Sequence, residues 1–111
     1  MAGVVHYTRI LGYVELAEHA FLLGLGITPI TENGGLPKVH VECDYARPLR
    51  FADEISIELT LIKSSPRSIH WKFQITANGE ISAHGKLITA YVDADGNPCE
   101  MPTQWRSLLS Q

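Results

Sequence analysis

Acidic and imidazole side chains gather where hydrophobic residues recur at helical spacing. Glu15 and Glu18 lie in this stretch, and His19 follows Glu15 by four residues, which places Glu15 and His19 on one face of a helix. A carboxylate beside a reacting carbonyl can attack it or activate a water molecule. Histidine titrates near neutral pH and can act as an acid or a base. A lone carboxylate is a weak signal, so a structural or surface role is the favoured alternative for Glu15.

A second group of polar side chains lies in a predicted turn between two strands. The group contains two cations and three hydroxyls: Lys63, Ser64, Ser65, Arg67 and Ser68. Arginine and lysine suit phosphate groups because they are charged hydrogen-bond donors. The alternative is an ordinary solvated β-turn, and both interpretations stay open at this point.

The acidic stretch requires a helix, which we predict from Tyr7 to Leu23. Its hydrophobic residues cover nearly the whole circumference, a pattern typical of a helix that is buried on several sides. Gly24, Gly26 and Pro29 follow as stop signals. The next segment, from Thr28 to Pro37, is predicted to be a loop.

The rest of the chain predicts four strands and a short helix. Hydrophobic and polar residues alternate in the segments 38–45, 55–63, 68–76 and 80–92, and Asn78-Gly79 is a strong hairpin signal. The alternation changes phase in the last strand, which predicts a bulge near Gly85. A turn at 93–98 precedes a helix at 103–109. The pattern predicts one α+β domain over residues 1–111, with the strands wrapped around one face of the long helix.

Several segments carry a resemblance to a known family. They are Ala2-Gly3-Val4-Val5-His6-Tyr7, the helix with Tyr13 and Glu15-Leu16-Ala17-Glu18, Pro48-Leu49, and Asp53. The chain resembles the 4-hydroxybenzoyl-CoA thioesterase family of hotdog proteins from Ala2 to the region of Met101 and Pro102. The resemblance implies an antiparallel sheet wrapped around one long central helix. It also implies hydrolysis of an acyl-CoA or aroyl-CoA thioester to the free acid and coenzyme A.

The resemblance also implies roles for particular residues. The backbone N–H near Tyr7 would bind the oxyanion, Gly3 would let the backbone approach the ligand, and His6 would orient substrate or water. The alternatives are a helix entry loop and a capping or interface histidine. The turn with Lys63, Ser65, Arg67 and Ser68 would hold the coenzyme A phosphates. Glu15 is a candidate for the catalytic carboxylate, since some hotdog thioesterases use a glutamate on the helix.

The chain departs from the family at its start. Related proteins have a strand before the glycine motif and an aspartate three residues before the glycine, which here falls just ahead of Met1. We expect the coding sequence to begin upstream of Met1. The alternatives are a shortened chain, or a catalytically silent subunit that binds acyl-CoA or has a structural role.

Composition excludes several other classes of function. The formal net charge of -3 is unlike the basic face of a nucleic-acid-binding protein. Apolar runs are too short for a membrane span, and Cys43 and Cys99 suggest reduced thiols in the cytoplasm. His40, His70 and His84 lack zinc-site spacing, so we expect no metal and no cofactor besides the coenzyme A of the substrate. A domain of 111 residues buries little alone, which favours a homodimer or homotetramer. The resemblance implies that the strand at 39–45 pairs with its symmetry mate across a two-fold axis.

Overall fold

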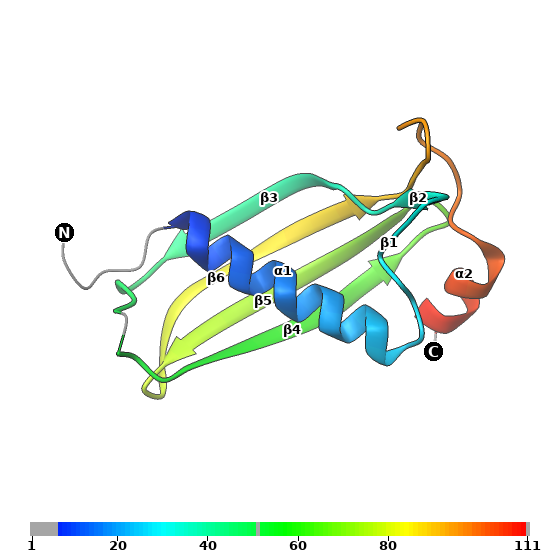
Figure 1. The fold of residues 1–111 in the computed structure, drawn as a ribbon. Helices are drawn as coiled ribbons and strands as arrows, with labels where there is room; N and C mark the ends of the chain where they lie inside the picture. The colour runs from blue at the N-terminus through cyan, green and yellow to red at the C-terminus, as the bar shows by residue number, and fades with distance from the viewer. Residues whose placement is uncertain (1–6, 51, 111) are drawn as a thin grey trace.

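The computed structural model describes residues 7–50 and 52–110. One long helix lies across one face of an antiparallel sheet, and a short helix closes one end (Figure 1). In chain order the elements are α1 (Tyr7–Gly24), β1 (Ile30–Thr31), β2 (Gly34–Gly35), β3 (Lys38–Tyr45), β4 (Ile55–Ser64), β5 (Ser68–Ala77), β6 (Glu80–Ala90), β7 (Val92–Asp93) and α2 (Thr103–Leu109). Both predicted helices and the four long strands are therefore confirmed to within two residues at each end.

The main sheet has the strand order β3-β6-β5-β4, with every neighbouring pair antiparallel. Within the described part of the chain, β3 and β4 are its two edges. The hairpin between β5 and β6 turns at Asn78 and Gly79, whose φ angles of 53° and 83° lie in the left-handed region that asparagine and glycine tolerate best.

The core lies between α1 and the inner face of the sheet. The central strand β5 contributes a row of buried side chains: Ile69, Trp71, Phe73, Ile75 and Ala77. From α1, Ile10, Val14 and Leu22 pack onto them, and the ring of Phe21 meets Trp71 edge to face at 5.2 Å between centroids. Alternate residues of β5 thus set the position of the helix.

The segment 28–37 is not the simple loop that the sequence predicts. Ile30–Thr31 and Gly34–Gly35 form two short strands, and the second of these pairs with β7. The predicted last strand is accordingly divided, because the chain leaves the main sheet after Ala90 and pairs with the small sheet from Val92. Isolated two-residue strands have too little alternation to be recognised from sequence.

The bulge predicted in the last strand occurs, but it lies three residues before Gly85. Ile75 pairs with Ala83 and Thr76 with Ile81, so the extra residue is Ser82. Gly85 stays in register opposite Phe73, and a Cβ atom on Gly85 would lie 2.8 Å from Cζ of that ring. Close packing, not a bulge, therefore requires glycine there.

Candidate active site

The proposed oxyanion site falls at the start of α1. This helix begins at Tyr7, so the N–H groups of its first turn have no acceptor within the helix and lie at the positive end of its dipole. Such an end can stabilise a negative oxygen. Gly3 and His6 lie outside the described residues, and the side chain of Tyr7 is not among those described. Their roles remain predictions.

A three-residue ion cluster joins α1 to the edge strand β3. Lys38, the first residue of β3, places its Nζ 2.6 Å from Oε1 of Glu18 and 3.0 Å from Oε2 of Glu15. Glu18 is 1% exposed, whereas the Glu15 side chain is 51% exposed. The buried member of the cluster is therefore Glu18, a residue that sequence reasoning left without a role.

The ion pairs favour the charged forms of Lys38 and Glu15. Burial would lower the pKa of Lys38, but hydrogen bonds to Glu18 and Glu15 outweigh burial and raise that pKa above its usual value. The hydrogen bond from Lys38, together with its positive charge, lowers the pKa of Glu15. A carboxylate bonded to an ammonium group is a weaker base and nucleophile than a free one. The geometry thus gives Glu15 an ion-pair role.

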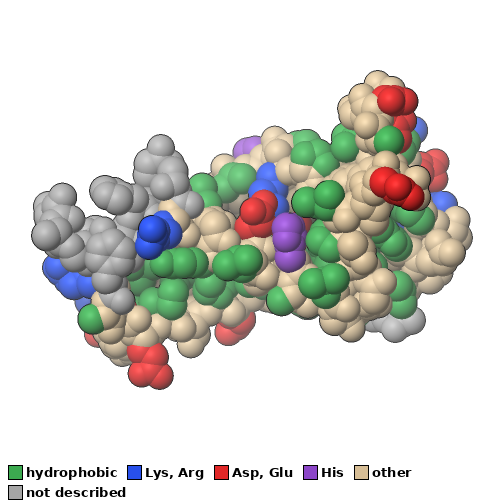
Figure 2. Space-filling view, in the orientation of Figure 1, with side chains coloured by type: hydrophobic (Ala, Val, Ile, Leu, Met, Phe, Trp, Pro, Cys, Tyr) green, Lys and Arg blue, Asp and Glu red, His purple; other side chains and the backbone are tan. Residues whose placement is uncertain are grey.

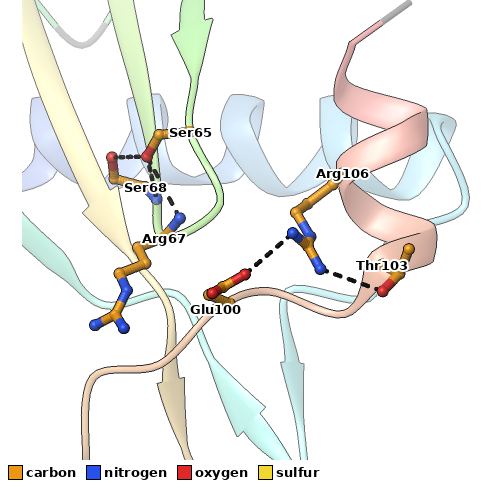
Figure 3. Close-up of polar contacts among 6 residues, drawn as sticks. All are labelled: Ser65, Arg67, Ser68, Glu100, Thr103 and Arg106. Atoms are coloured by element: carbon orange, nitrogen blue, oxygen red, sulfur yellow. Dashed lines mark hydrogen bonds and ion pairs between the residues drawn. The ribbon is translucent and has the colours of Figure 1, made fainter.

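The turn between β4 and β5 is closed by its own serines (Figure 3). The hydroxyls of Ser65 and Ser68 lie 2.8 Å apart, and Ser65 Oγ also accepts from the backbone N–H of Ser68 at 3.1 Å. Arg67 is exposed, and in Figure 3 its guanidinium points away from the serine pair. Lys63 is also exposed and follows a bulge in β4. The cations of this turn are accessible to an anion, while the serine hydroxyls are engaged with each other.

The C-terminal segment braces this turn. The N–H of Met101 donates to the Pro66 carbonyl at 2.8 Å, and the N–H of Tyr91 donates to the Arg67 carbonyl at 2.9 Å. In the same region Arg106 of α2 pairs with Glu100 at 3.1 Å (Figure 3). These hydrogen bonds hold the backbone of the turn in place at Pro66 and Arg67.

Within one chain, the candidate phosphate-binding turn and the candidate oxyanion site lie far apart. The turn between β4 and β5 and the start of α1 are at opposite ends of the sheet (Figure 1). A strand of the length of β4, 10 residues, spans about 33 Å. A single chain therefore does not bring Arg67 to the first turn of α1, and one substrate could meet both only if two chains contributed.

A cleft of about 470 Å³ carries two further cations that sequence reasoning missed. Arg47 and Arg50 line it together with Asp53, Asn78 and Glu80. Arg47 pairs with Glu80 at 2.7 Å, and Asp53 accepts from the backbone N–H of Arg50 at 2.8 Å. The segment between β3 and β4, which carries both arginines, lies at the end of the sheet where α1 begins (Figure 1). The sequence signal for it is the pair of arginines around Pro48 and Leu49.

A larger bowl of about 840 Å³ lies on the sheet face turned away from α1. Lys72 and Lys86 stand opposite each other in register, and the acidic residues Glu42, Asp44 and Glu58 surround them. Three carboxylates against two amines do not favour an anion. Cys43 also lines the bowl, and burial raises the pKa of its thiol, which disfavours a thiolate nucleophile.

No group of three or more potential metal ligands occurs within residues 7–50 and 52–110. In the same part of the chain, no helix is long and apolar enough to cross a membrane.

The fold agrees with that of a family of known proteins. The chain belongs to the thioesterase-like superfamily, whose model matches residues 1–109. The resemblance seen in the sequence and the hotdog fold that it implies are confirmed.

The chain is also similar to individual proteins that have more specific names. The chain is 25% identical to a 1,4-dihydroxy-2-naphthoyl-CoA hydrolase of Prochlorococcus marinus (strain MIT 9303), over 91% of this chain and 75% of that protein. It is 29% identical to the protein of the same name from Synechococcus sp. (strain CC9605), over 91% of this chain and 74% of that protein. Among solved structures, a 1,4-dihydroxy-2-naphthoyl-CoA thioesterase from Synechocystis has the same fold, with a TM-score of 0.85 at 17% identity over 98% of this chain and 85% of that one.

Proposed function

We propose that the protein hydrolyses coenzyme A thioesters of aromatic acids and releases the free acid and coenzyme A. The match to the thioesterase-like superfamily over residues 1–109 is the observation that carries the proposal. The relatives named 1,4-dihydroxy-2-naphthoyl-CoA hydrolase support an aromatic acyl group.

The chemistry needs a water molecule, an oxyanion site and a carboxylate. The water oxygen adds to the thioester carbon, the carbonyl oxygen becomes negative, and the C–S bond then breaks as the sulfur of coenzyme A takes up a proton. The first-turn N–H groups of α1, beginning near Tyr7, are the proposed donors to the negative oxygen. Glu15 is the candidate within this chain for the carboxylate that activates the water.

The phosphates of coenzyme A would bind to cations, either in the turn between β4 and β5 or in the cleft lined by Arg47 and Arg50. The notable feature of the turn with Lys63, Ser65, Arg67 and Ser68 is that its two cations are exposed. Since this turn lies far from the start of α1 in the same chain, we propose that it serves the site of a second copy. Arg50, at the same end as the start of α1, is the alternative phosphate ligand within one chain.

We also propose that the chain forms one domain over residues 1–111 and works as a cytoplasmic homo-oligomer without a cofactor. The edge strand β3 leaves Val39, Val41 and Tyr45 between 42% and 61% exposed, which supports its pairing with a second β3. Light scattering at micromolar concentration tests this. The account expects at least twice the chain mass of 12.3 kDa, and a clean monomer would reject it.

One observation favours a second candidate function, a silent acyl-CoA-binding subunit. Glu15 and Glu18, the two carboxylates of α1, both bond to Lys38, so the helix offers no free carboxylate as the base. Thiol release across a panel of aroyl-CoA and acyl-CoA substrates, with coenzyme A binding measured by calorimetry, separates the two functions. The enzyme should favour aromatic substrates by at least about tenfold. A silent subunit should bind coenzyme A and leave every substrate intact.

A further inference from the structure

Tyr91 lies where three parts of the chain meet. The residue stands between β6 and β7, and its side chain is 6% exposed. Its backbone N–H donates to the Arg67 carbonyl in the turn between β4 and β5, and its carbonyl accepts from the N–H of Cys99 at 3.2 Å. This buried junction therefore connects the turn to the C-terminal segment that leads into α2.

The ring of Tyr91 also holds α2 in place. Trp105 of α2 packs on this ring edge to face, with 5.3 Å between the ring centroids. Leu109, which is 3% exposed, attaches the same helix to the hydrophobic core. α2 has only seven residues and would not be stable alone, so its position depends on these contacts. In the space-filling view this end of the molecule forms one continuous surface with α1 (Figure 2).

The segment before α2 reaches the turn directly. Met101 is 1% exposed, and its N–H donates to the Pro66 carbonyl at 2.8 Å. One residue earlier, Glu100 pairs with Arg106 of α2 (Figure 3). The carbonyls of Pro66 and Arg67 at the tip of the turn are therefore both held by residues outside the turn.

The bonds inside the turn act at a different place. They join its two ends, Ser65 and Ser68, whose hydroxyls lie 2.8 Å apart. At the tip, the N–H of Arg67 reaches Ser65 Oγ only at 3.4 Å. The backbone at the tip, from which the exposed side chain of Arg67 leaves, therefore depends on the contacts with Tyr91 and Met101.

We propose that Tyr91 and Trp105 are positioning residues for the binding of coenzyme A. They act through the backbone of the turn, which they order before the phosphates arrive, and they touch no part of the substrate. A turn that is ordered in advance loses less conformational freedom on binding, so its cations bind the phosphates more tightly. This role rests on the proposed binding of the phosphates by Lys63 and Arg67.

Two thioesters separate positioning from general stability. An aroyl-CoA carries the phosphates, whereas the aroyl thioester of pantetheine has the same reacting group and no phosphate. Trp105→Ala should raise the KM for the aroyl-CoA about threefold to tenfold, the usual cost of ordering one side chain on binding. It should leave kcat and the KM for the pantetheine thioester at their parent values. Trp105→Phe, which keeps a ring beside Tyr91, should restore most of the loss.

Ile75→Ala is the matched control for lost stability. Ile75 is fully buried and lies toward the end of β5 opposite the turn. The substitution should lower the melting temperature and leave the ratio of the two KM values unchanged. An equal rise in both KM values for Trp105→Ala, a rise in neither, or a changed ratio for Ile75→Ala would overturn the proposal.

A second substitution tests whether Trp105 acts through Arg67. In the Arg67→Gln background, Trp105→Ala should weaken binding no further, because the two changes remove the same interaction. Calorimetry with coenzyme A measures the affinities without turnover, so a chain that hydrolyses nothing still tests the positioning role. Additive losses would overturn that role, whereas absence of thiol release from either thioester by the parent chain would reject the hydrolase alone.

Discussion

Nζ of Lys38 lies 2.6 Å from Oε1 of Glu18, and this contact ties the first residue of an edge strand to the buried side of the long helix. Glu18 is 1% exposed, so its charge depends on Lys38 for compensation. The start of α1, where the proposed oxyanion donors lie, belongs to the same rigid helix. The ion pair therefore helps to fix the position of the site on the sheet.

Replacing Glu18 should destabilise the protein strongly. Glu18→Gln leaves the mostly buried Lys38 side chain, which is 21% exposed, with only the exposed Glu15 as a partner. Breaking a buried pair typically costs about 3–5 kcal/mol. Glu15→Gln is the matched control, and it should cost less than about 1 kcal/mol because Glu15 is half exposed. Urea unfolding of both variants measures the free energies. Equal losses for the two variants would contradict the assigned burial.

The Glu15 contact predicts a modest dependence of stability on pH. Because Lys38 lowers the pKa of Glu15 in the folded state, the contact stabilises the protein above the unfolded value of about 4.5. This contribution is lost as pH falls below that value through the folded pKa. Over roughly pH 5 to pH 3, the free energy of unfolding should therefore fall less steeply with decreasing pH for Glu15→Gln than for the parent. Identical slopes would argue against the contact.

Gly85→Ala should destabilise the sheet. The added Cβ would lie 2.8 Å from Cζ of Phe73 and would also clash with the backbone carbonyl of Glu42. Overpacking of this kind costs about 1–3 kcal/mol. Gly24→Ala at the end of α1 is the control, since open space surrounds that position and alanine favours a helix. Thermal unfolding compares the two. A melting temperature for Gly85→Ala equal to that of the parent would show that the glycine is not required.

These residues show how far sequence reasoning reaches. Alternation in β5 and helical spacing in α1 predicted the elements because a single period governs each of them. The pairing of Lys38 with Glu18 joins residues 20 positions apart, and no local period encodes it. The change of alternation in β6 correctly predicted a bulge in that strand, but the predicted position of the bulge was wrong. The sequence of β6 alone does not tell whether the bulge lies at Ser82 or at Gly85. The pairing of β6 with β5 places it at Ser82.

Removing a phosphate ligand should weaken coenzyme A binding about tenfold, the usual value of one charge-assisted hydrogen bond. Arg67→Gln should show this loss if the turn between β4 and β5 holds the phosphates. Arg50→Gln should show it instead if the cleft at the start of α1 does. Lys72→Gln, in the bowl on the outer face, serves as the control. Calorimetry with coenzyme A measures all three affinities, and parent affinity for both arginine variants would remove both candidate phosphate sites.

The most direct measurement is the steady-state rate at which the purified protein releases thiol from an aroyl-CoA. The account predicts saturable release of coenzyme A and free acid in equal amounts, at a rate at least about 10⁶ times that in buffer. It also predicts a higher kcat/KM for aromatic than for straight-chain acyl groups. Binding of coenzyme A with thiol release no faster than in buffer would contradict the hydrolase and leave the silent subunit.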